Sequence, residues 1–121
     1  MNLNGQVGEF KYDNLFAGSS IPVEVKAVRL KSGQGLLVKG TVLGIANDGL
    51  AVKVNSAATD GSNTADCILT DDVDTTEEVV HTAYISGMFN RLALVFGGTD
   101  TAAKHEKTLR TLNIILKDIL D

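Results

Sequence analysis

The chain has 121 residues, of which 44% are hydrophobic and 21% are charged, so it is predicted to form one soluble domain with a modest core. The net charge is −4 and the 11 basic residues are scattered, which argues against nucleic acid as a partner because phosphate binding needs clustered basic side chains. No apolar run approaches the roughly 20 residues that span a bilayer, so no membrane segment is expected.

The first 18 residues show no sustained periodicity, yet they carry the apolar side chains Phe10, Tyr12, Leu15 and Phe16. Two interpretations remain open for this segment. It is either an edge strand packed on the domain or an extended arm that pairs with the sheet edge of a partner. The segment lacks the basic start and the apolar stretch of a signal peptide, so we expect the protein to be made in a cytoplasm.

From residue 21 the pattern becomes that of β-strands. Apolar and polar residues alternate over 21–27, which predicts a half-buried strand that faces the core with Ile21, Val23, Val25 and Ala27. The apolar phase then shifts at Val28, which predicts a bulge. Residues 36–46 form an apolar run typical of a buried strand, and the Asn-Asp-Gly sequence at 47–49 predicts a hairpin to an alternating strand over 50–55.

The second half of the chain predicts two more strands and one helix. Residues 55–63 have the composition of a loop, 64–70 read as a short strand, and 77–87 read as a longer alternating strand. A helix is predicted from about Ala102 to Leu112, and Asn113 is a plausible stop. The remaining "IILKDIL" sequence either extends the helix or forms a closing strand, and we favour the strand because it begins with β-branched residues.

Within the predicted helix, individual residues can be assigned to the cap, to the exposed surface and to the core. A side chain within 99–101 can cap the free amides of its first turn. Glu106 and Arg110 have the i,i+4 spacing of an exposed ion pair, and Leu109 and Leu112 are expected to face inward. Nothing along the chain indicates an internal repeat or a domain boundary, so residues 1–18 are taken as an arm and residues 19–121 as a single β-rich domain.

The acidic sequence "TDDVD" at 70–74 is the first candidate site. A calcium loop would need a glycine at its bend, and none lies between Asp71 and Glu78. A general acid–base pair would need burial to separate the pKa values of its two carboxyl groups, whereas this turn is polar. A solvated corner is therefore preferred over a weak cation site and over catalysis.

The remaining reactive side chains are His81, His105 and Cys67, and they are far apart in the sequence. A zinc site needs several Cys or His ligands at short spacing, which this chain lacks. His81 is expected to be partly buried in a strand, and His105 is expected to be solvated on the helix. The glycines of "FGGTD" at 96–100 offer free amides for an anion, although a plain turn with a helix cap explains them better. No catalytic residue, cofactor or metal is therefore predicted.

Several segments, taken in order, resemble the head decoration proteins of tailed bacteriophages of the lambda type. The segments are "GLLVKGTVLG", "SAATDGSNTADCILTDDVDT", "AYISGMFNRLALV" and "HEKTLRTLNIILKDIL". The resemblance covers roughly residues 15–120 and rests on the order and spacing of these segments together. It implies a mainly β fold, a compact β-clip-like or β-barrel domain, which joins the single C-terminal helix predicted above.

The resemblance also implies a structural virion protein rather than an enzyme. Such proteins bind as homotrimers to the outer surface of the expanded capsid, at its threefold positions, and stabilise the shell against the packaged DNA. The implied partners are the major capsid protein and further copies of the chain. An N-terminal arm that pairs with a strand of the shell protein is also implied, which assigns Phe10, Tyr12, Leu15 and Phe16 to capsid binding.

Two other functions were weighed. A trimeric dUTPase-like nucleotide hydrolase shares a β-clip-like fold and a similar length, but its "PRSSL" motif and its glycine-rich C-terminal arm are absent here. An accessory or fibre-base protein of a virion on the same scaffold is the second alternative, and the sequence distinguishes it poorly from a capsid decoration protein.

Overall fold

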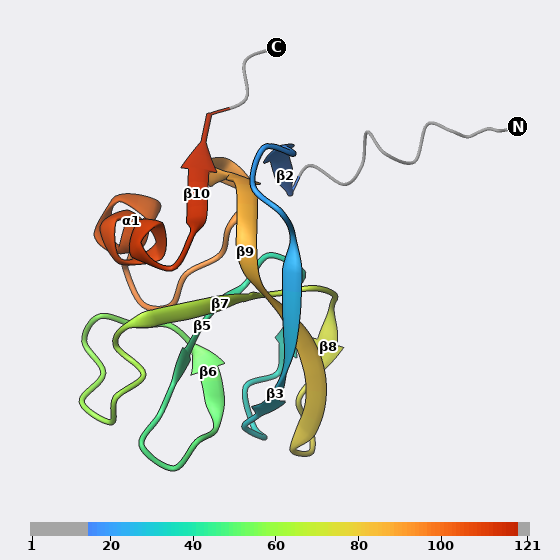
Figure 1. The fold of residues 1–121 in the computed structure, drawn as a ribbon. Coiled ribbons are helices and arrows are strands. Elements are labelled where there is room, and N and C mark those ends of the chain that lie inside the picture. Colours follow the sequence, from blue (N-terminus) through green and yellow to red (C-terminus); the bar gives the residue numbers. More distant parts are fainter. Residues whose placement is uncertain (1–14, 119–121) are drawn as a thin grey trace, which may run out of the picture.

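The computed structural model describes residues 15–118, which form a mainly β domain with a five-strand barrel and one helix near the C-terminus (Figure 1). This confirms the predicted fold class. In chain order the elements are β2 (Phe16–Gly18), β3 (Glu24–Leu30), β4 (Leu36–Leu37), β5 (Val42–Ile45), β6 (Ala51–Lys53), β7 (Ala65–Leu69), β8 (Val73–Asp74), β9 (Val79–Asn90), η2 (Arg91–Ala93), α1 (Ala102–Thr111) and β10 (Ile114–Lys117).

The barrel closes through strand pairs in the order β3, β9, β7, β5, β6 and back to β3. Most pairs are antiparallel, and β3 meets β6 in parallel at a single register pair, Leu30 with Ala51. The predicted hairpin is confirmed, because β5 and β6 pair with Ile45 opposite Ala51 across the Asn-Asp-Gly turn. Gly49 has a φ of 86°, the left-handed conformation that such a turn requires.

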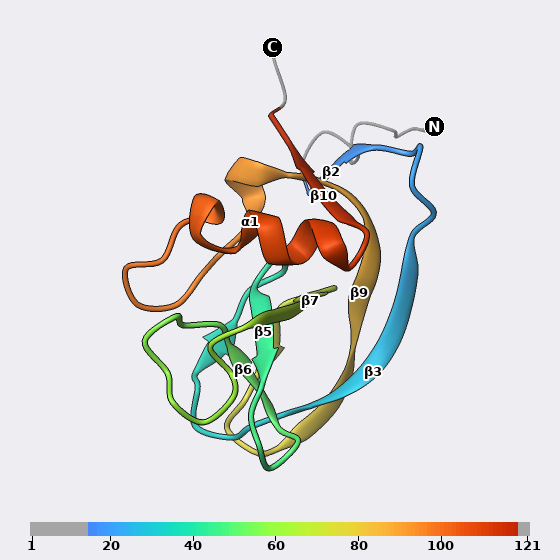
Figure 2. The same cartoon turned by 60° about the vertical axis from the view of Figure 1, so that its left-hand side comes forward.

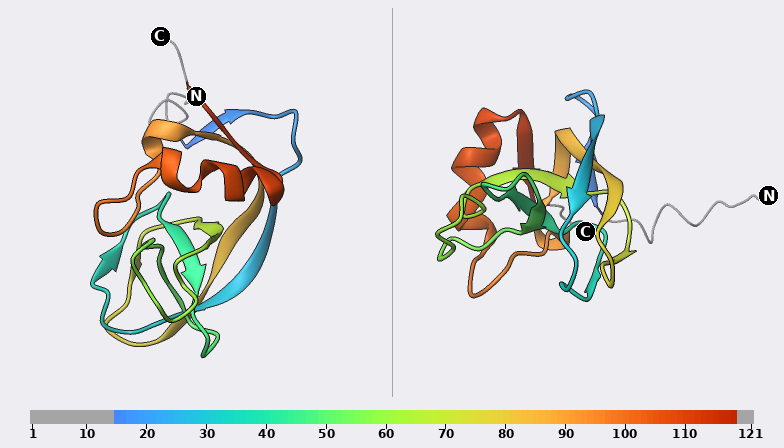
Figure 3. Two further views of the ribbon diagram at one scale, coloured as in Figure 1. Left: turned by 90° about the vertical axis from the view of Figure 1, so that its left-hand side faces the viewer. Right: turned by 90° about the horizontal axis from the view of Figure 1, so that it is seen from below.

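Strand β9 is longer than the predicted 77–87 segment, and it pairs with four other described strands: β2, β3, β7 and β10. Its end leaves the barrel and forms a small three-stranded sheet, with β2 antiparallel on one side and β10 parallel on the other. Phe16 lies opposite Phe89, and Ile114 lies opposite Gly87. The first and last described strands therefore flank the end of β9 at one end of the molecule (Figures 1 and 3).

Helix α1 lies across β7 and β10 and covers one opening of the barrel (Figures 2 and 3). Its predicted start is confirmed, and Asn113 ends it with a φ of 70°, after which the closing strand β10 begins. Leu109 is buried as predicted. Leu112 is 40% exposed, so the prediction that it faces inward is wrong, because the helix has already ended at Thr111.

The core consists of two clusters of buried side chains, one inside the barrel and one between the barrel, α1 and the three-stranded end. The barrel cluster includes Leu30, Leu43 and Leu69, and the other includes Ile68, Phe89 and Leu109. Since Ile68 and Leu69 are neighbours on β7 and point to opposite faces, this strand separates the two clusters. Both of its faces are therefore buried.

Two predicted strands differ from the structure. The 36–46 run is not one strand, because the chain turns at Gly40, where φ is 91°, and divides into β4 and β5. The expected bulge at Val28 is also absent, and the pairing irregularity lies between Glu24 and Val25 instead. Val28 and Leu30 are buried, whereas Val23 and Val25 are about half exposed. The two apolar phases of this segment therefore lie on opposite faces of one strand.

Candidate interaction surface

The acidic corner is a structural turn. Asp72 accepts a hydrogen bond from the backbone N–H of Lys39 at 2.7 Å, and Asp74 accepts from both the N–H and the hydroxyl of Thr76. Asp71 accepts from Thr70 and contacts His81 at 3.0 Å, and these contacts hold the pKa of its carboxyl below the usual range. Each carboxylate thus fixes the chain where β8 joins its neighbours.

His105 is buried, so the prediction that it is solvated is wrong. Its ring lies parallel to Phe96 at 5.5 Å, and its Nε2 lies 2.7 Å from Asp100 Oδ2. Asp100 also accepts hydrogen bonds from the N–H and the hydroxyl of Ser56, and these bonds, with that of His105, lower the pKa of its carboxyl to about 2. Because Asp100 is committed to these partners, it does not cap the helix, and Thr101 occupies the N-cap without a side-chain bond.

The Ser56–Asp100–His105 cluster does not have the arrangement of a hydrolytic triad. A hydrolytic triad needs the histidine beside the hydroxyl that it activates, with the carboxylate behind the histidine. Here the carboxylate stands between the other two groups, and the side chains of Asp100 and His105 are only 4% exposed. The cluster joins the loop after β6 to the first turn of α1.

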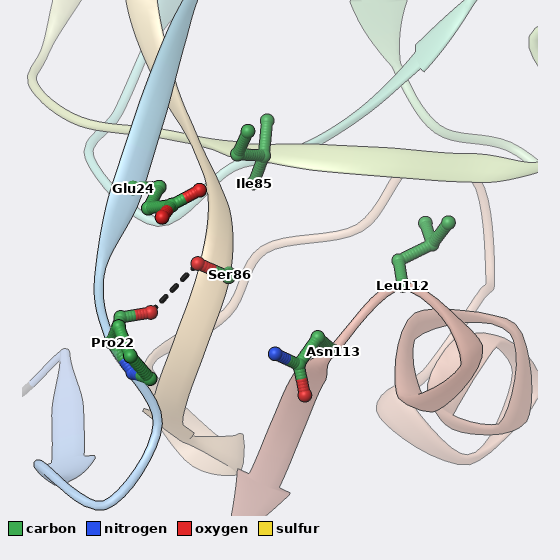
Figure 4. Close-up of a pocket in the computed structure, with 6 residues that line it drawn as sticks. All are labelled: Pro22, Glu24, Ile85, Ser86, Leu112 and Asn113. Atoms are coloured by element: carbon green, nitrogen blue, oxygen red, sulfur yellow. Dashed lines mark hydrogen bonds between the residues drawn. The ribbon is translucent and has the colours of Figure 1, made fainter.

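A shallow groove of about 280 Å³ runs between the β3–β9 ladder and the turn from α1 to β10 (Figure 4). The Ser86 hydroxyl in it donates to the Pro22 carbonyl at 2.7 Å, and the groove also contains the carboxylate of Glu24. The Ser86 hydroxyl is therefore committed to a backbone carbonyl rather than to a general base. Within residues 15–118 no three potential metal-ligating side chains gather either, and no helix there is long and apolar enough to cross a membrane.

The predicted arm residues have different positions. Phe10 and Tyr12 lie outside the described residues. Leu15 is 3% exposed and belongs to the core, and its carbonyl accepts a hydrogen bond from the N–H of Asn90 at 2.6 Å. Phe16 packs against Tyr84 and Phe89, each at a ring-centroid distance of 5.1 Å. Leu15 and Phe16 thus fasten the end of the N-terminal segment to β9.

The outer face of the β3–β9 ladder exposes apolar side chains to solvent. Val25 is opposite Tyr84, Ala27 is opposite Thr82, and Arg29 is opposite Val80, so these side chains share one face. Val25 and Val80 are each 51% exposed. The sequence marked this apolar phase but assigned it to the core, and alternation alone cannot say which face of a strand the rest of the chain covers.

A family model for the bacteriophage lambda head decoration protein D matches residues 5–115. The chain belongs to this family. A search of curated proteins found no match. Head decoration proteins are structural phage proteins, so the family assigns a decoration role at a phage capsid. The geometry agrees with a binding function, because the described residues offer exposed apolar surface, and the acidic corner and the Asp100 cluster hold parts of the fold together.

Proposed function

We propose that this decoration protein binds as a homotrimer to the outer surface of the expanded capsid of its phage, at the threefold positions, and stabilises the shell without catalysing a reaction. The observation that carries this proposal is the family match over residues 5–115. The acidic charge of the chain supports a position on the outside of the shell, away from the packaged DNA.

The N-terminal segment supplies the first contact with the major capsid protein in this proposal. Phe10 and Tyr12 are two positions apart, so in an extended segment they share one face and can pack on the shell while the backbone pairs with a strand there. Leu15 and Phe16 hold the end of this segment on β9, as their packing supports. Rigid attachment limits the volume that the segment explores and raises its effective concentration near the shell.

The outer face of the β3–β9 ladder supplies the contact between copies. Val25 and Val80 expose β-branched side chains there, and their burial against a second copy would remove apolar surface from water. A trimer presents three N-terminal segments at once, so several moderate contacts with the shell act together.

Co-sedimentation tests the proposal. The full-length protein is mixed with expanded, undecorated capsids of its phage and, separately, with the compact precursor shells. Saturable binding to expanded shells only is the expected result, and the double variant Phe10→Ala/Tyr12→Ala should bind more weakly with an unchanged unfolding temperature. The absence of binding to either shell would contradict the capsid function. Unchanged binding of the double variant would contradict the role of the N-terminal segment alone.

A further inference from the structure

Among residues 15–118, Leu92 is the most exposed large hydrophobic residue, at 84%. It lies on η2, the short turn that follows β9. A single exposed leucine needs no explanation by itself, because much of any protein surface is apolar. Three further observations indicate that Leu92 is part of a binding site.

The backbone that carries Leu92 is held firmly. The buried side chain of Asn90 accepts a hydrogen bond from the Leu92 N–H at 3.1 Å and caps the turn. Arg91 donates to Glu106 on α1, to Asp118 at 3.0 Å and to the carbonyl of Leu116 at 3.3 Å. A side chain presented from a fixed backbone loses less conformational entropy when a partner binds it.

An apolar groove of about 560 Å³ lies beside Leu92, between η2 and the start of α1. Its walls are mostly apolar, from Leu94, Val95, Phe96, Ala102 and Ala103, and Arg91, Asp100 and Thr101 complete them. The Phe96 wall is fixed by stacking on His105, which is itself bonded to Asp100. A projecting leucine beside an apolar groove of this size suits a partner that brings apolar side chains of its own, because binding hot spots are packed and desolvated.

The position of the groove indicates its occupant. Leu15, which joins the domain to the 14 residues before it, bonds through its carbonyl to Asn90, two residues before Leu92. A partner that takes the N-terminal segment close to its attachment therefore also faces η2.

We propose that Leu92 and the groove beside it form a second contact with the capsid shell protein, one in which an apolar segment of the shell packs around Leu92 and fills the groove. This inference rests on the proposed function, since it takes the shell protein as the partner of the N-terminal segment. It adds an apolar contact on the folded domain to the contact made by the segment.

The test uses full-length variants in the co-sedimentation assay with expanded capsids. Leu92→Ser is expected to weaken binding at least 10-fold, and Ala103→Phe, which fills the groove from α1, is expected to weaken it similarly. Leu36→Ser is the matched control, because Leu36 is also an exposed leucine, at 62%, but does not line the groove. It lies on β4, which pairs with β8. The control should bind within about 2-fold of the wild type.

The outcomes separate this inference from the proposed function. If the wild type binds and Leu92→Ser binds equally well, the groove contact is wrong while the decoration function stands. An equal loss of binding for Leu36→Ser would also overturn the groove contact, because the loss would then not depend on Leu92 or its groove. Loss of the trimer in Leu92→Ser, measured by light scattering, would assign the groove to a second copy and overturn the shell as its occupant. If the wild type itself fails to bind, both proposals fail.

Discussion

At the scale of single residues, the polar side chains of this protein act mainly on its fold. Asp100 shows this most clearly, because one buried carboxylate accepts hydrogen bonds from Ser56 and contacts His105. From the sequence, Asp100 was one of three candidates for the helix cap, and His105 was expected in solvent. The error is physical in origin, since the loop that brings Ser56 to Asp100 is 44 residues away in the chain and local spacing carries no sign of it.

Replacement of Asp100 by asparagine tests the strength of this cluster. Asp100→Asn keeps the shape but removes the charge that strengthens the bonds to Ser56 and His105, so the free energy of unfolding should fall by about 2 to 3 kcal/mol. Urea unfolding measures the change. Asp48→Asn, at an exposed turn where the side chain accepts only from Leu50, should change stability by less than about 0.5 kcal/mol. Equal effects for both variants would contradict the account.

The same carboxyl predicts a pH dependence. The pKa of Asp100 is about 2 in the folded protein, below the value of about 3.9 in an unfolded chain. The unfolded state therefore binds this proton first as pH falls, and about 2 kcal/mol of stability that is present above pH 4 is lost between pH 4 and pH 2. Unfolding measured across this range should show a smaller loss in Asp100→Asn. An identical pH profile for wild type and variant would show that this group does not contribute.

Gly40 is a second residue on which the fold depends. Its φ is 91°, and a Cβ there would lie 2.6 Å from the carbonyl oxygen of Ala93. Gly40→Ala should therefore cost about 3 kcal/mol, from left-handed strain plus the clash. Gly49→Ala has a similar φ of 86° but open space around the new methyl group, so about 1 kcal/mol is expected. Thermal unfolding of the two variants measures both losses of stability, and their difference gives the cost of the clash with Ala93. Equal losses would argue against close packing at Gly40.

At the scale of elements, locally encoded features were predictable. The Asn-Asp-Gly hairpin and the stop after α1 at Asn113 follow from turn and capping chemistry within a few residues. The orientation of β3 was not predictable in this way. Its alternation marks an apolar face, but Val25 faces solvent because the barrel packs against the opposite side, where Val28 and Leu30 lie. Tertiary packing decides which face of β3 is covered, and the uncovered face is a candidate binding surface.

Arg91 connects elements that are distant in the sequence. It bonds to Glu106 of α1, to Asp118 and to the backbone of β10, and it thus fixes the C-terminal strand beside the end of β9. Arg91→Met retains the aliphatic stem and removes the charge, so we expect a loss of about 1 to 2 kcal/mol. Amide hydrogen exchange should accelerate in Ile114–Lys117 before it does in β5. Unchanged exchange in β10 would contradict this role.

At the scale of the whole molecule, the fold separates two surfaces. The apolar β3–β9 face lies along the side of the barrel, and the end that holds β2, η2 and β10 carries the attachment of the N-terminal segment (Figure 2). A molecule that binds its own copies through one surface can thus offer the other to a shell. The family resemblance implied contacts with further copies and with a capsid, whereas the exposed side chains that we propose for these contacts, such as Val25 and Leu92, emerged only from the folded chain.

The proposed trimer makes a direct prediction. Light scattering should give the free protein a mass three times the chain mass of 12.8 kDa. Val25→Glu places a charge on the apolar β3–β9 face and should shift the population toward monomers without loss of β structure in circular dichroism. Val38→Glu, at another exposed valine, is the control and should remain trimeric. A trimer that tolerates Val25→Glu would exclude this face as the contact.

Electron cryomicroscopy of expanded capsids, with and without the added protein, tests the central claim most directly. The account predicts additional density on the outer surface at the threefold positions, with the end that carries β2, η2 and β10 toward the shell. Its absence, or its location on the inner surface or at the tail attachment, would contradict a role in capsid decoration.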